Sequence, residues 1–421
     1  MGFALQVVLL DIANGDNFIN QAKAFGVTMK TSLIFGLVIL FFSSTHLAAQ
    51  DASLTWEEYR QQRQQQLDQI QAAQDSALHQ SIADYEAYVF QHEMEFNRFR
   101  DEMIREWGDF KERTKTNWIE YQNGGKVRWD VDFEDGEGTI EVLADENDTE
   151  DSLLITIENT VLDLISSKGT ESELPDETKK EIQQEPVLAG QVDIPEDMDS
   201  LQYAKEVTEQ TVIKEVEAED GTIRKIAVLN LQLVPDHLRT RAEKFRKEVE
   251  TYSDKYEIDP TLVLAIIHTE SFFNPMAKSH ANALGLMQIV PRTAGRDVYR
   301  VLNGKDAIPS AEYLFNPDQN LHFGSTYIDI LMNRYMRGIE DRVVHEYLVI
   351  CAYNTGAGNV ARAYINSTNF NNARDTINGM SAQENYDYLL ANLPWDETKD
   401  YLKKVTDRRT QYREWISTGN D

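Results

Sequence analysis

The sequence predicts an α+β protein of 421 residues, in which a long helix and a small acidic α+β domain precede an all-helical carboxy-terminal domain. Residues 51–107 contain neither glycine nor proline and repeat apolar side chains at helical spacing. Two later stretches, 126–133 and 225–234, alternate apolar and polar residues as half-buried strands do. Beyond Pro235 this alternation stops, and helical patterns continue to the end of the chain.

The first fifty residues have the features of an export signal. Lys30 precedes a ten-residue apolar run, Leu33 to Phe42, and small or polar residues follow as far as Gln50. We expect residues 29–50 to be a secretory signal peptide, and residues 1–28 to derive from a start codon assigned too far upstream. An uncleaved membrane anchor is the less favoured alternative, because ten apolar residues are few for a bilayer span.

These features predict a protein that is secreted across the inner membrane and is periplasmic or associated with the cell envelope. The mature chain is expected to begin near Gln50 or Asp51. No cysteine follows the apolar run, so the sequence offers no lipid-attachment cysteine there.

Residues 51–120 are predicted to form a long amphipathic helix. The apolar stripe of its second half consists of Phe96, Phe99, Met103, Trp107 and Phe110. Its first half is rich in glutamine and has few apolar residues, so three alternatives stay open: a solvated helix, a helix paired with another one, or a partly disordered segment. The oligomeric state therefore stays open. The glycine pair that follows Asn123 interrupts the helical pattern.

Residues 121–235 are predicted to form the small α+β domain. We expect a β-hairpin that turns at Asp135-Gly136, a helix over 151–167, loops and short helices over 168–222, and a third strand over 225–234. No loop in this region has the ligand spacing of a calcium site.

Charge divides the chain into two parts. The net charge is −30, and residues 132–220 hold 28 acidic against 5 basic residues, whereas residues 236–421 hold 25 against 22. A polyanion would be repelled by this protein, so nucleic acid is excluded as a partner. The acidic segment is expected to be a solvated surface or to bind a protein partner.

The carboxy-terminal region, 236–421, is predicted to be an all-helical globular domain. Asp259-Pro260 is a typical helix start, and the nearly all-apolar helix that follows ends at Asn274-Pro275. The single cysteine, Cys351, lies in an apolar run and is interpreted as a small core residue rather than a nucleophile.

Glu270 is the candidate catalytic residue. It stands at the carboxyl end of that apolar helix, where desolvation and the negative end of the helix dipole both disfavour a carboxylate. Both effects raise the pKa of a carboxyl group, as a general acid near neutral pH requires. A carboxylate that simply turns to solvent is the commoner alternative for a residue at a helix end.

The surrounding residue types favour a carbohydrate substrate. Gln288 and Asn354 supply amides, Tyr353 supplies an aromatic surface, and Gly285 permits close approach of the backbone. Sugars present apolar faces and many hydroxyl groups, which such a groove can bind. Each residue taken alone also has an ordinary structural explanation.

Three motifs together resemble the lytic transglycosylase family of the lysozyme superfamily. They are ES-x-x-NP-x-A-x-S from Glu270, A-x-GLMQ-x-x-P-x-TAG from Ala283, and AYN-x-G-x-GNV from Ala352. The preceding domain, with VRWDVDFEDG, is similar to that of the membrane-bound lytic murein transglycosylase C group. The sequence departs from that group in lacking the lipid-attachment cysteine and in its acidic stretch 145–220.

This resemblance implies a lysozyme-like catalytic domain that cleaves the β-1,4 bond between N-acetylmuramic acid and N-acetylglucosamine in peptidoglycan, leaving 1,6-anhydro ends. It implies that Glu270 is the only acid and base, that Ser279 and Gln288 bind the substrate, and that Tyr353 positions the sugar or the acid. Met287 and Asn354 would shape the pocket. No metal and no cofactor is implied. Because peptidoglycan is itself anionic, the acidic segment is not expected to bind it by charge.

Two other functions stay open. One is a goose-type lysozyme-like hydrolase, for which Asp297 or Asp306 would have to supply the second carboxylate that two-acid glycosidases use. The other is a non-catalytic scaffold that binds peptidoglycan through the amino-terminal region. The complete set of residues around Glu270 favours the transglycosylase over both.

Overall fold

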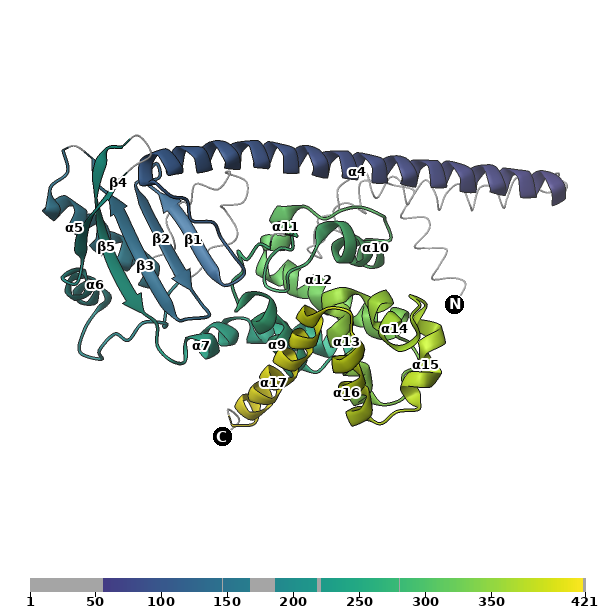
Figure 1. Ribbon diagram of the computed structural model, residues 1–421. Coiled ribbons are helices and arrows are strands. Elements are labelled where there is room, and N and C mark those ends of the chain that lie inside the picture. Colours follow the sequence, from purple (N-terminus) through teal and green to yellow (C-terminus); the bar gives the residue numbers. More distant parts are fainter. Residues whose placement is uncertain (1–55, 146, 167–185, 218–220, 280, 419–421) are drawn as a thin grey trace, which may run out of the picture. The chain divides into compact units, whose positions relative to one another are not determined.

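The computed structural model describes residues 56–145, 147–166, 186–217, 221–279 and 281–418 (Figure 1). The predicted upstream segment 1–28, the signal peptide 29–50 and the start of the mature chain lie outside them. The chain divides into two units, residues 1–73 and 74–421. None of the described helices combines the length and the apolar character that crossing a bilayer requires.

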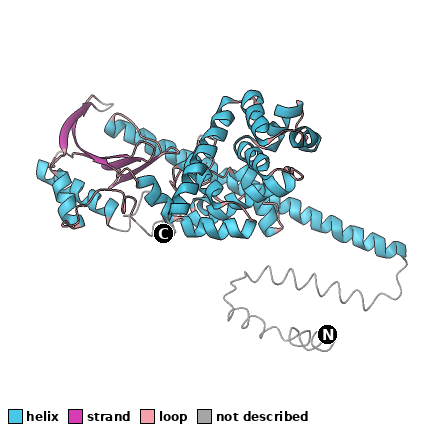
Figure 2. Cartoon of the chain, turned by 90° about the horizontal axis from the view of Figure 1, so that it is seen from below, coloured by secondary structure: helices cyan, strands magenta, loops and turns pink. Residues whose placement is uncertain are grey.

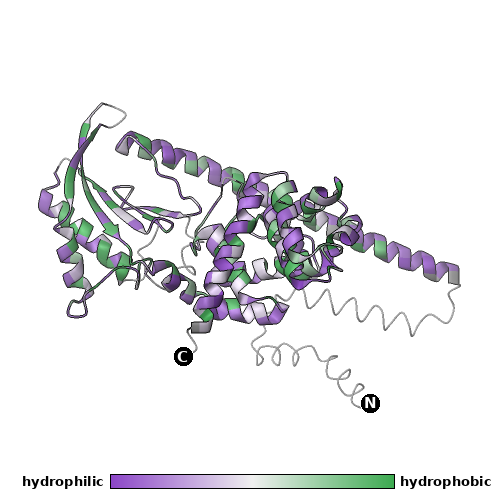
Figure 3. Ribbon diagram, turned by 60° about the horizontal axis from the view of Figure 1, so that its bottom comes forward, coloured by the Kyte–Doolittle hydropathy of each residue, from purple (hydrophilic) through white to green (hydrophobic). Residues whose placement is uncertain are grey.

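Helix α4 (Trp56–Trp107) begins in the first unit and continues into the second. Figure 3 shows hydrophilic residues over much of its length, in agreement with its mostly exposed side chains. The helix ends where Gly108 adopts a left-handed φ of 78°, and the Gly108 N–H bonds to the carbonyl of Ile104 at 2.9 Å. The prediction that the helix extends to residue 120 is therefore wrong, because a glycine here terminates it.

The second unit contains an antiparallel sheet with strand order β1-β2-β3-β5-β4. Its strands are β1 (Asn117–Gln122), β2 (Val127–Asp132), β3 (Glu137–Leu143), β4 (Val212–Glu217) and β5 (Ile223–Gln232). The predicted hairpin is confirmed, since β2 pairs with β3 and Val131 lies opposite Gly138. The predicted third strand corresponds to β5, which pairs with β3.

Strands β1 and β4 correct the sequence-based assignment of residues 117–120 to helix and of 212–217 to loop. In β1 four consecutive residues, Trp118 to Tyr121, are buried, so polar and apolar residues do not alternate in the usual way. Strand β4 lies at the edge of the sheet and exposes most of its side chains. Such a strand carries little apolar pattern in its sequence.

Both faces of the sheet are covered. Helix α5 (Glu150–Ile165), which confirms the predicted helix, and α6 (Ser200–Thr208) pack on one face in a cluster with Trp129. The last turns of α4 cover the other face, where Met103 and Trp107 pack with Ile119. The Trp107 indole N–H also donates to the carbonyl of Gly125 at 2.8 Å. The carboxyl end of α4 is therefore an integral part of this domain.

Beyond residue 236 the described chain forms only helices, apart from two isolated bridges around Leu284, which confirms the all-helical prediction (Figure 2). The longer helices are α7 (His237–Lys244), α8 (Arg246–Tyr256), α9 (Pro260–Ser271), α10 (Arg296–Asn303), α12 (Pro317–Ile330), α13 (Arg342–Thr355), α14 (Ala357–Ile365), α15 (Phe370–Asn378), α16 (Ala382–Asn392) and α17 (Asp396–Thr418). Short elements complete it: η1 (Pro291–Gly295), α11 (Ala311–Phe315) and η2 (Leu331–Tyr335).

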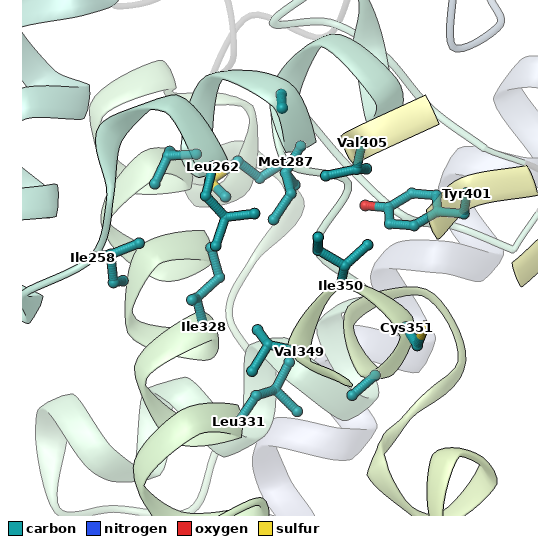
Figure 4. Packing of buried hydrophobic residues seen from close by; sticks show 14 of the residues in the cluster. Ile258, Leu262, Met287, Ile328, Leu331, Val349, Ile350, Cys351, Tyr401 and Val405 are labelled. Carbon is teal, nitrogen blue, oxygen red and sulfur yellow. The ribbon is translucent and has the colours of Figure 1, made fainter. Parts of the chain in front are cut away.

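Helix α9 lies in the core of this domain. All of its residues from Thr261 to Ser271 except Thr269 are buried. Figure 4 shows how Leu262 lies among core side chains that include Ile328 and Val349. Cys351 is fully buried in the same cluster, and burial raises the pKa of its thiol, so its interpretation as a core residue agrees with the structure.

Candidate active site

The carboxyl end of α9 positions Glu270. The helix begins at an Asp259 cap, whose Oδ1 accepts a hydrogen bond from the Thr261 N–H at 2.9 Å, and Pro260 occupies its first turn. It ends at Phe272 and Phe273, which both adopt left-handed backbone conformations with φ of 50° and 59°. Glu270 therefore lies in the last turn of a helix that is buried on nearly every side. The backbone changes direction directly after this helix.

The Glu270 side chain is only 7% exposed, and its carboxyl group has two polar partners among the described residues. The Tyr401 hydroxyl, from α17, donates to Oε1 at 2.8 Å. The Lys115 ammonium, from the segment between α4 and β1, lies 3.3 Å from Oε2. Each oxygen of the carboxyl group is therefore contacted by one donor, and the two donors lie far from Glu270 in the sequence, one before it and one after it.

Burial dominates the ionisation of Glu270. Desolvation raises the pKa of this carboxyl group above its ordinary value, although the Lys115 charge and the Tyr401 hydrogen bond lower it and the nearby Glu397 charge raises it. The net shift is upward. The prediction of a raised pKa from a buried helix end agrees with this geometry, and a carboxylate that turns to solvent does not.

The loop after α9 folds back under the helix. The Ser271 hydroxyl donates to the carbonyl of Leu286 at 2.7 Å. Asn320, from α12, accepts from the Met287 N–H at 2.8 Å and donates to the carbonyl of Leu284 at 2.9 Å. The loop therefore has a fixed backbone, held by buried side chains on either side of it.

Gln288 and Ser279 both lie in this loop. The Gln288 amide nitrogen donates to the carbonyls of Ala277 and Gly285, each at 3.0 Å. Its buried Oε1 has no hydrogen-bond partner among the described residues. The partly buried Ser279 accepts from the Ala283 N–H at 3.1 Å. Gln288 thus has a spare acceptor, and Ser279 keeps its hydroxyl proton available for donation.

Tyr353, at the end of α13, joins the loop to Glu270. Its hydroxyl donates to the carbonyl of Met287 at 2.8 Å, and its ring packs edge-on against Tyr327. Burial and then the charge of Glu270 raise the pKa of Tyr353 well above its ordinary value, so the phenol stays protonated. Tyr353 therefore lies within the electrostatic influence of Glu270, and its role toward the sugar or the acid stays a prediction.

The Met287 side chain packs in the core, and the Asn354 side chain contacts α17. The Met287 side chain is fully buried in the core, directly beside Gly324. A Cβ atom added to Gly324 would lie 2.1 Å from the Met287 sulfur. Only its backbone carbonyl is recorded as a contact of Tyr353. The Asn354 Oδ1 accepts from the Thr398 hydroxyl at 2.7 Å, which links α13 to α17.

His268 is a packing residue in this structure. It is buried, its Nδ1 lies 3.1 Å from the Tyr412 hydroxyl, and its ring packs edge-on against Phe272. Burial, with the charges of Arg408 and His237, lowers its pKa to about 3. The imidazole is therefore neutral at physiological pH.

Sequence reasoning missed Lys115 and Tyr401. Tyr401 belongs to an amphipathic helix in which nothing distinguishes it from a core tyrosine, and Lys115 precedes Glu270 by 155 positions. No local spacing rule connects residues so far apart. Only the packing of α17 and of the segment before β1 against α9 reveals them.

Asp297 and Asp306 are engaged elsewhere. Asp306 receives two hydrogen bonds from Arg296, at 2.6 and 2.8 Å, and one from Arg300 at 2.9 Å. Asp297 accepts from the Tyr335 hydroxyl at 2.8 Å. Neither is recorded as an influence on the ionisation of Glu270, whereas Glu397 is.

A cavity of about 580 Å³ lies beside the loop that carries Ser279. Lys278 and Asn282, on either side of that residue, belong to its wall. Most of the phenylalanine and tyrosine side chains in its wall come from α4, the segment after it and β1, and one comes from α11; they are Tyr85, Tyr88, Phe96, Phe99, Phe110, Tyr121 and Phe315. Glu270 itself is not part of the wall. In the part of the chain that the structure describes, no group of three or more His, Cys, Asp or Glu residues is arranged to hold a metal ion.

Comparison with known proteins identifies both domains. Residues 247–376 match the family model of the transglycosylase SLT domain, and residues 79–244 match that of the amino-terminal domain of membrane-bound lytic murein transglycosylase C. Proteins with the latter name from Sodalis glossinidius and Pectobacterium atrosepticum are each 36% identical to this chain. Each alignment covers 70% of this chain and 82% of the relative.

Among solved structures, the 70-kDa soluble lytic transglycosylase of Escherichia coli is 25% identical, with a TM-score of 0.33. That match covers 43% of this chain and 26% of the other. The family is decided by the first two relatives, because their identity to this chain extends over most of both chains. The chain belongs to the lytic transglycosylase family, with the enzymes named membrane-bound lytic murein transglycosylase C.

Proposed function

We propose that this enzyme cleaves the β-1,4 bond between N-acetylmuramic acid and N-acetylglucosamine in peptidoglycan and leaves a 1,6-anhydro end. The observation that carries the proposal is the buried carboxyl group of Glu270, whose pKa is raised by desolvation. A single carboxyl group suffices when the substrate supplies its own nucleophile, whereas hydrolysis by a two-acid mechanism needs a second carboxylate.

In the first step the protonated Glu270 donates its proton to the glycosidic oxygen as the bond from that oxygen to C1 of the muramic sugar breaks. The N-acetylglucosamine end leaves as an alcohol. The positive charge that develops at C1 is stabilised by the substrate's own N-acetyl group, and Glu270 is left as a carboxylate.

In the second step the Glu270 carboxylate removes the proton from the C6 hydroxyl of the same muramic sugar. The C6 oxygen attacks C1 and closes the 1,6-anhydro ring. Glu270 regains its proton, so no water is consumed and the enzyme returns to its starting state. A pKa raised toward neutrality suits a group that must act once as an acid and once as a base.

Residues around Glu270 would bind the sugars. The free Oε1 of Gln288 can accept a hydrogen bond from a substrate N–H or O–H group, and the Ser279 hydroxyl can donate one. Tyr353 holds the loop through the carbonyl of Met287, and the charge of Glu270 acts on its phenol. The aromatic wall of the neighbouring cavity offers surfaces for the apolar faces of sugar rings.

The substrate implies the cell envelope as the place of action, which agrees with the predicted signal peptide at 29–50. The relatives carry "membrane-bound" in their names. We propose that this protein is exported and acts on peptidoglycan without a lipid anchor attached to a cysteine after the apolar run.

Mass spectrometry of digested peptidoglycan sacculi tests the proposal. The enzyme is expected to release anhydro-muropeptides, whereas a lysozyme-like hydrolase would release reducing muropeptides and a scaffold protein would release neither. The Glu270→Gln variant keeps the size of the side chain but cannot donate a proton, and it should lose anhydro products. Anhydro ends from that variant at the parent rate would refute the assignment.

A further inference from the structure

Lys115 reaches Glu270 from a domain other than the helical one. It lies in the segment between α4 and β1, within the region that matches the amino-terminal domain of the relatives. Its Nζ lies 3.3 Å from the Glu270 Oε2 and forms an ion pair with it. The other described groups that act on this carboxyl group, Tyr401 and Glu397, belong to the helical domain.

The backbone on both sides of Lys115 is anchored to the sheet. Arg113 donates to the carbonyl of Ile119 at 2.7 Å and pairs with Glu120 at 3.0 Å. The carbonyl of Thr116 accepts from the Phe133 N–H at 3.0 Å. These contacts fix the point from which the lysine side chain extends, so its position beside Glu270 is set by the sheet domain.

The two partners differ in their exposure to water. The Lys115 side chain is 43% exposed and retains much of its hydration, whereas the Glu270 side chain is 7% exposed. A partly hydrated cation at the edge of a buried site costs little desolvation energy and still acts on the buried carboxylate. Tyr401 contacts the other oxygen, Tyr353 lies near as a neutral phenol, and Glu397 opposes ionisation. Within the described part of the chain, Lys115 is the one cation that forms an ion pair with Glu270.

We propose that Lys115 is a positioning residue of the active site, through which the amino-terminal domain orients Glu270 and stabilises its carboxylate form between the two steps of the reaction. This inference rests on the proposed function. After donating its proton to the glycosidic oxygen, Glu270 is left as a buried anion. The ammonium group offsets the cost of that anion until the C6 hydroxyl gives up its proton, and Lys115 itself neither gives nor takes one.

The Lys115→Met variant tests this role, because methionine keeps most of the length of the side chain and removes its charge. The measurement is the pH dependence of kcat/KM for release of anhydro-muropeptides from sacculi. The alkaline limb of this profile reports the loss of the proton from the Glu270 carboxyl group in the free enzyme. Loss of the positive charge should move that limb upward by about one pH unit. Lys115→Arg should restore the position of the limb, since the charge is retained.

Lys126→Met is the matched control. Lys126 belongs to the same domain, is 34% exposed and pairs with Glu106 and Asp145 rather than with Glu270. Its substitution should leave the alkaline limb in place. A purely structural role of Lys115 would lower activity without moving the limb, so an unshifted limb in Lys115→Met overturns the inference.

A second measurement does not depend on activity. Carbon-13 NMR of protein labelled at the glutamate carboxyl carbon identifies the Glu270 resonance as the one that Glu270→Gln removes. The pH at which this resonance titrates should rise in Lys115→Met and stay the same in Lys126→Met. An unchanged titration in Lys115→Met overturns the inference. If Glu270→Gln abolishes anhydro products but Lys115→Met changes neither profile, this inference fails alone. If Glu270→Gln stays fully active, the proposed function fails.

Discussion

The Arg241 guanidinium donates a hydrogen bond of 2.6 Å to the carbonyl oxygen of Phe273, just beyond the end of the helix that carries Glu270. A second bond of 3.1 Å reaches the carbonyl of Phe272. Arg241 is buried, and its guanidinium lies 3.4 Å from the centre of the Phe133 ring in the sheet domain. One side chain therefore connects the carboxyl end of α9 to the preceding domain, at the point where the chain turns away from Glu270.

Replacing Arg241 with methionine is expected to destabilise the protein by about 2 to 4 kcal/mol, because two buried carbonyl groups lose their donor. Activity should also fall, since the end of α9 is then less firmly held. Urea denaturation and kcat measure the two effects. Arg239→Met, an exposed change on the same helix, should alter stability by no more than about 0.5 kcal/mol. Equal denaturation midpoints for the two variants would contradict this explanation.

Tyr401→Phe removes the hydroxyl that donates to the Glu270 Oε1. A hydrogen bond to a carboxylate both orients it and favours its ionised form, so kcat/KM should fall about tenfold and the alkaline limb of the pH profile should move upward. Tyr412→Phe makes the same change on the same helix, where the hydroxyl contacts His268 instead. The prediction fails if the two variants have the same pH profile.

Glu270→Gln should stabilise the protein at neutral and alkaline pH. The folded-state pKa of Glu270 is raised, so the folded protein binds this proton more tightly than the unfolded chain does. This contribution to stability is fully present at pH values below the pKa that Glu270 has in the unfolded chain. It is lost as the pH rises through the pKa that Glu270 has in the folded protein. A glutamine does not ionise, so the advantage of the variant in Tm should grow from pH 4 to pH 8. A constant or shrinking difference would show that burial does not raise this pKa.

Gly285→Ala should destabilise the protein far more than Gly304→Ala. Both glycines have positive φ, 73° and 63°, so each substitution costs about 1 to 2 kcal/mol of backbone strain. At Gly285 the added methyl would also lie 2.4 Å from the Asn320 amide nitrogen, whereas nothing lies within 4 Å at Gly304. Overpacking adds about 1 to 3 kcal/mol there. Chemical denaturation of both variants measures the difference, and equal losses would contradict it.

The sequence alone predicted the elements whose patterns are local. The all-helical domain, the hairpin that turns at Asp135-Gly136 and the apolar helix that carries Glu270 in its last turn are all present. The prediction failed at β1, which is buried along most of its length, and at β4, which is exposed at the sheet edge. Neither strand alternates polar and apolar residues clearly, so periodicity could not detect it.

The residues of the candidate site also differ in whether a local sequence pattern identifies them. Glu270, Gln288 and Tyr353 were identified from motifs in which residue type and spacing carry the information, and the structure brings Tyr353 into the electrostatic environment of Glu270. The predicted roles of Ser279 and Asn354 stay predictions, because no bound sugar tests them. The Met287 side chain packs in the core, and it is the backbone carbonyl that contacts Tyr353.

What the sequence determined by itself was the kind of carboxyl group at position 270: one acid at the end of an apolar helix, with a pKa that burial must raise. What only the tertiary structure decided was which donors meet its two oxygens. Tyr401 and Lys115 lie 131 positions after it and 155 positions before it, respectively. Burial follows from the composition of a helix, but a pair of contacts across such separations exists only once the two domains have packed around it.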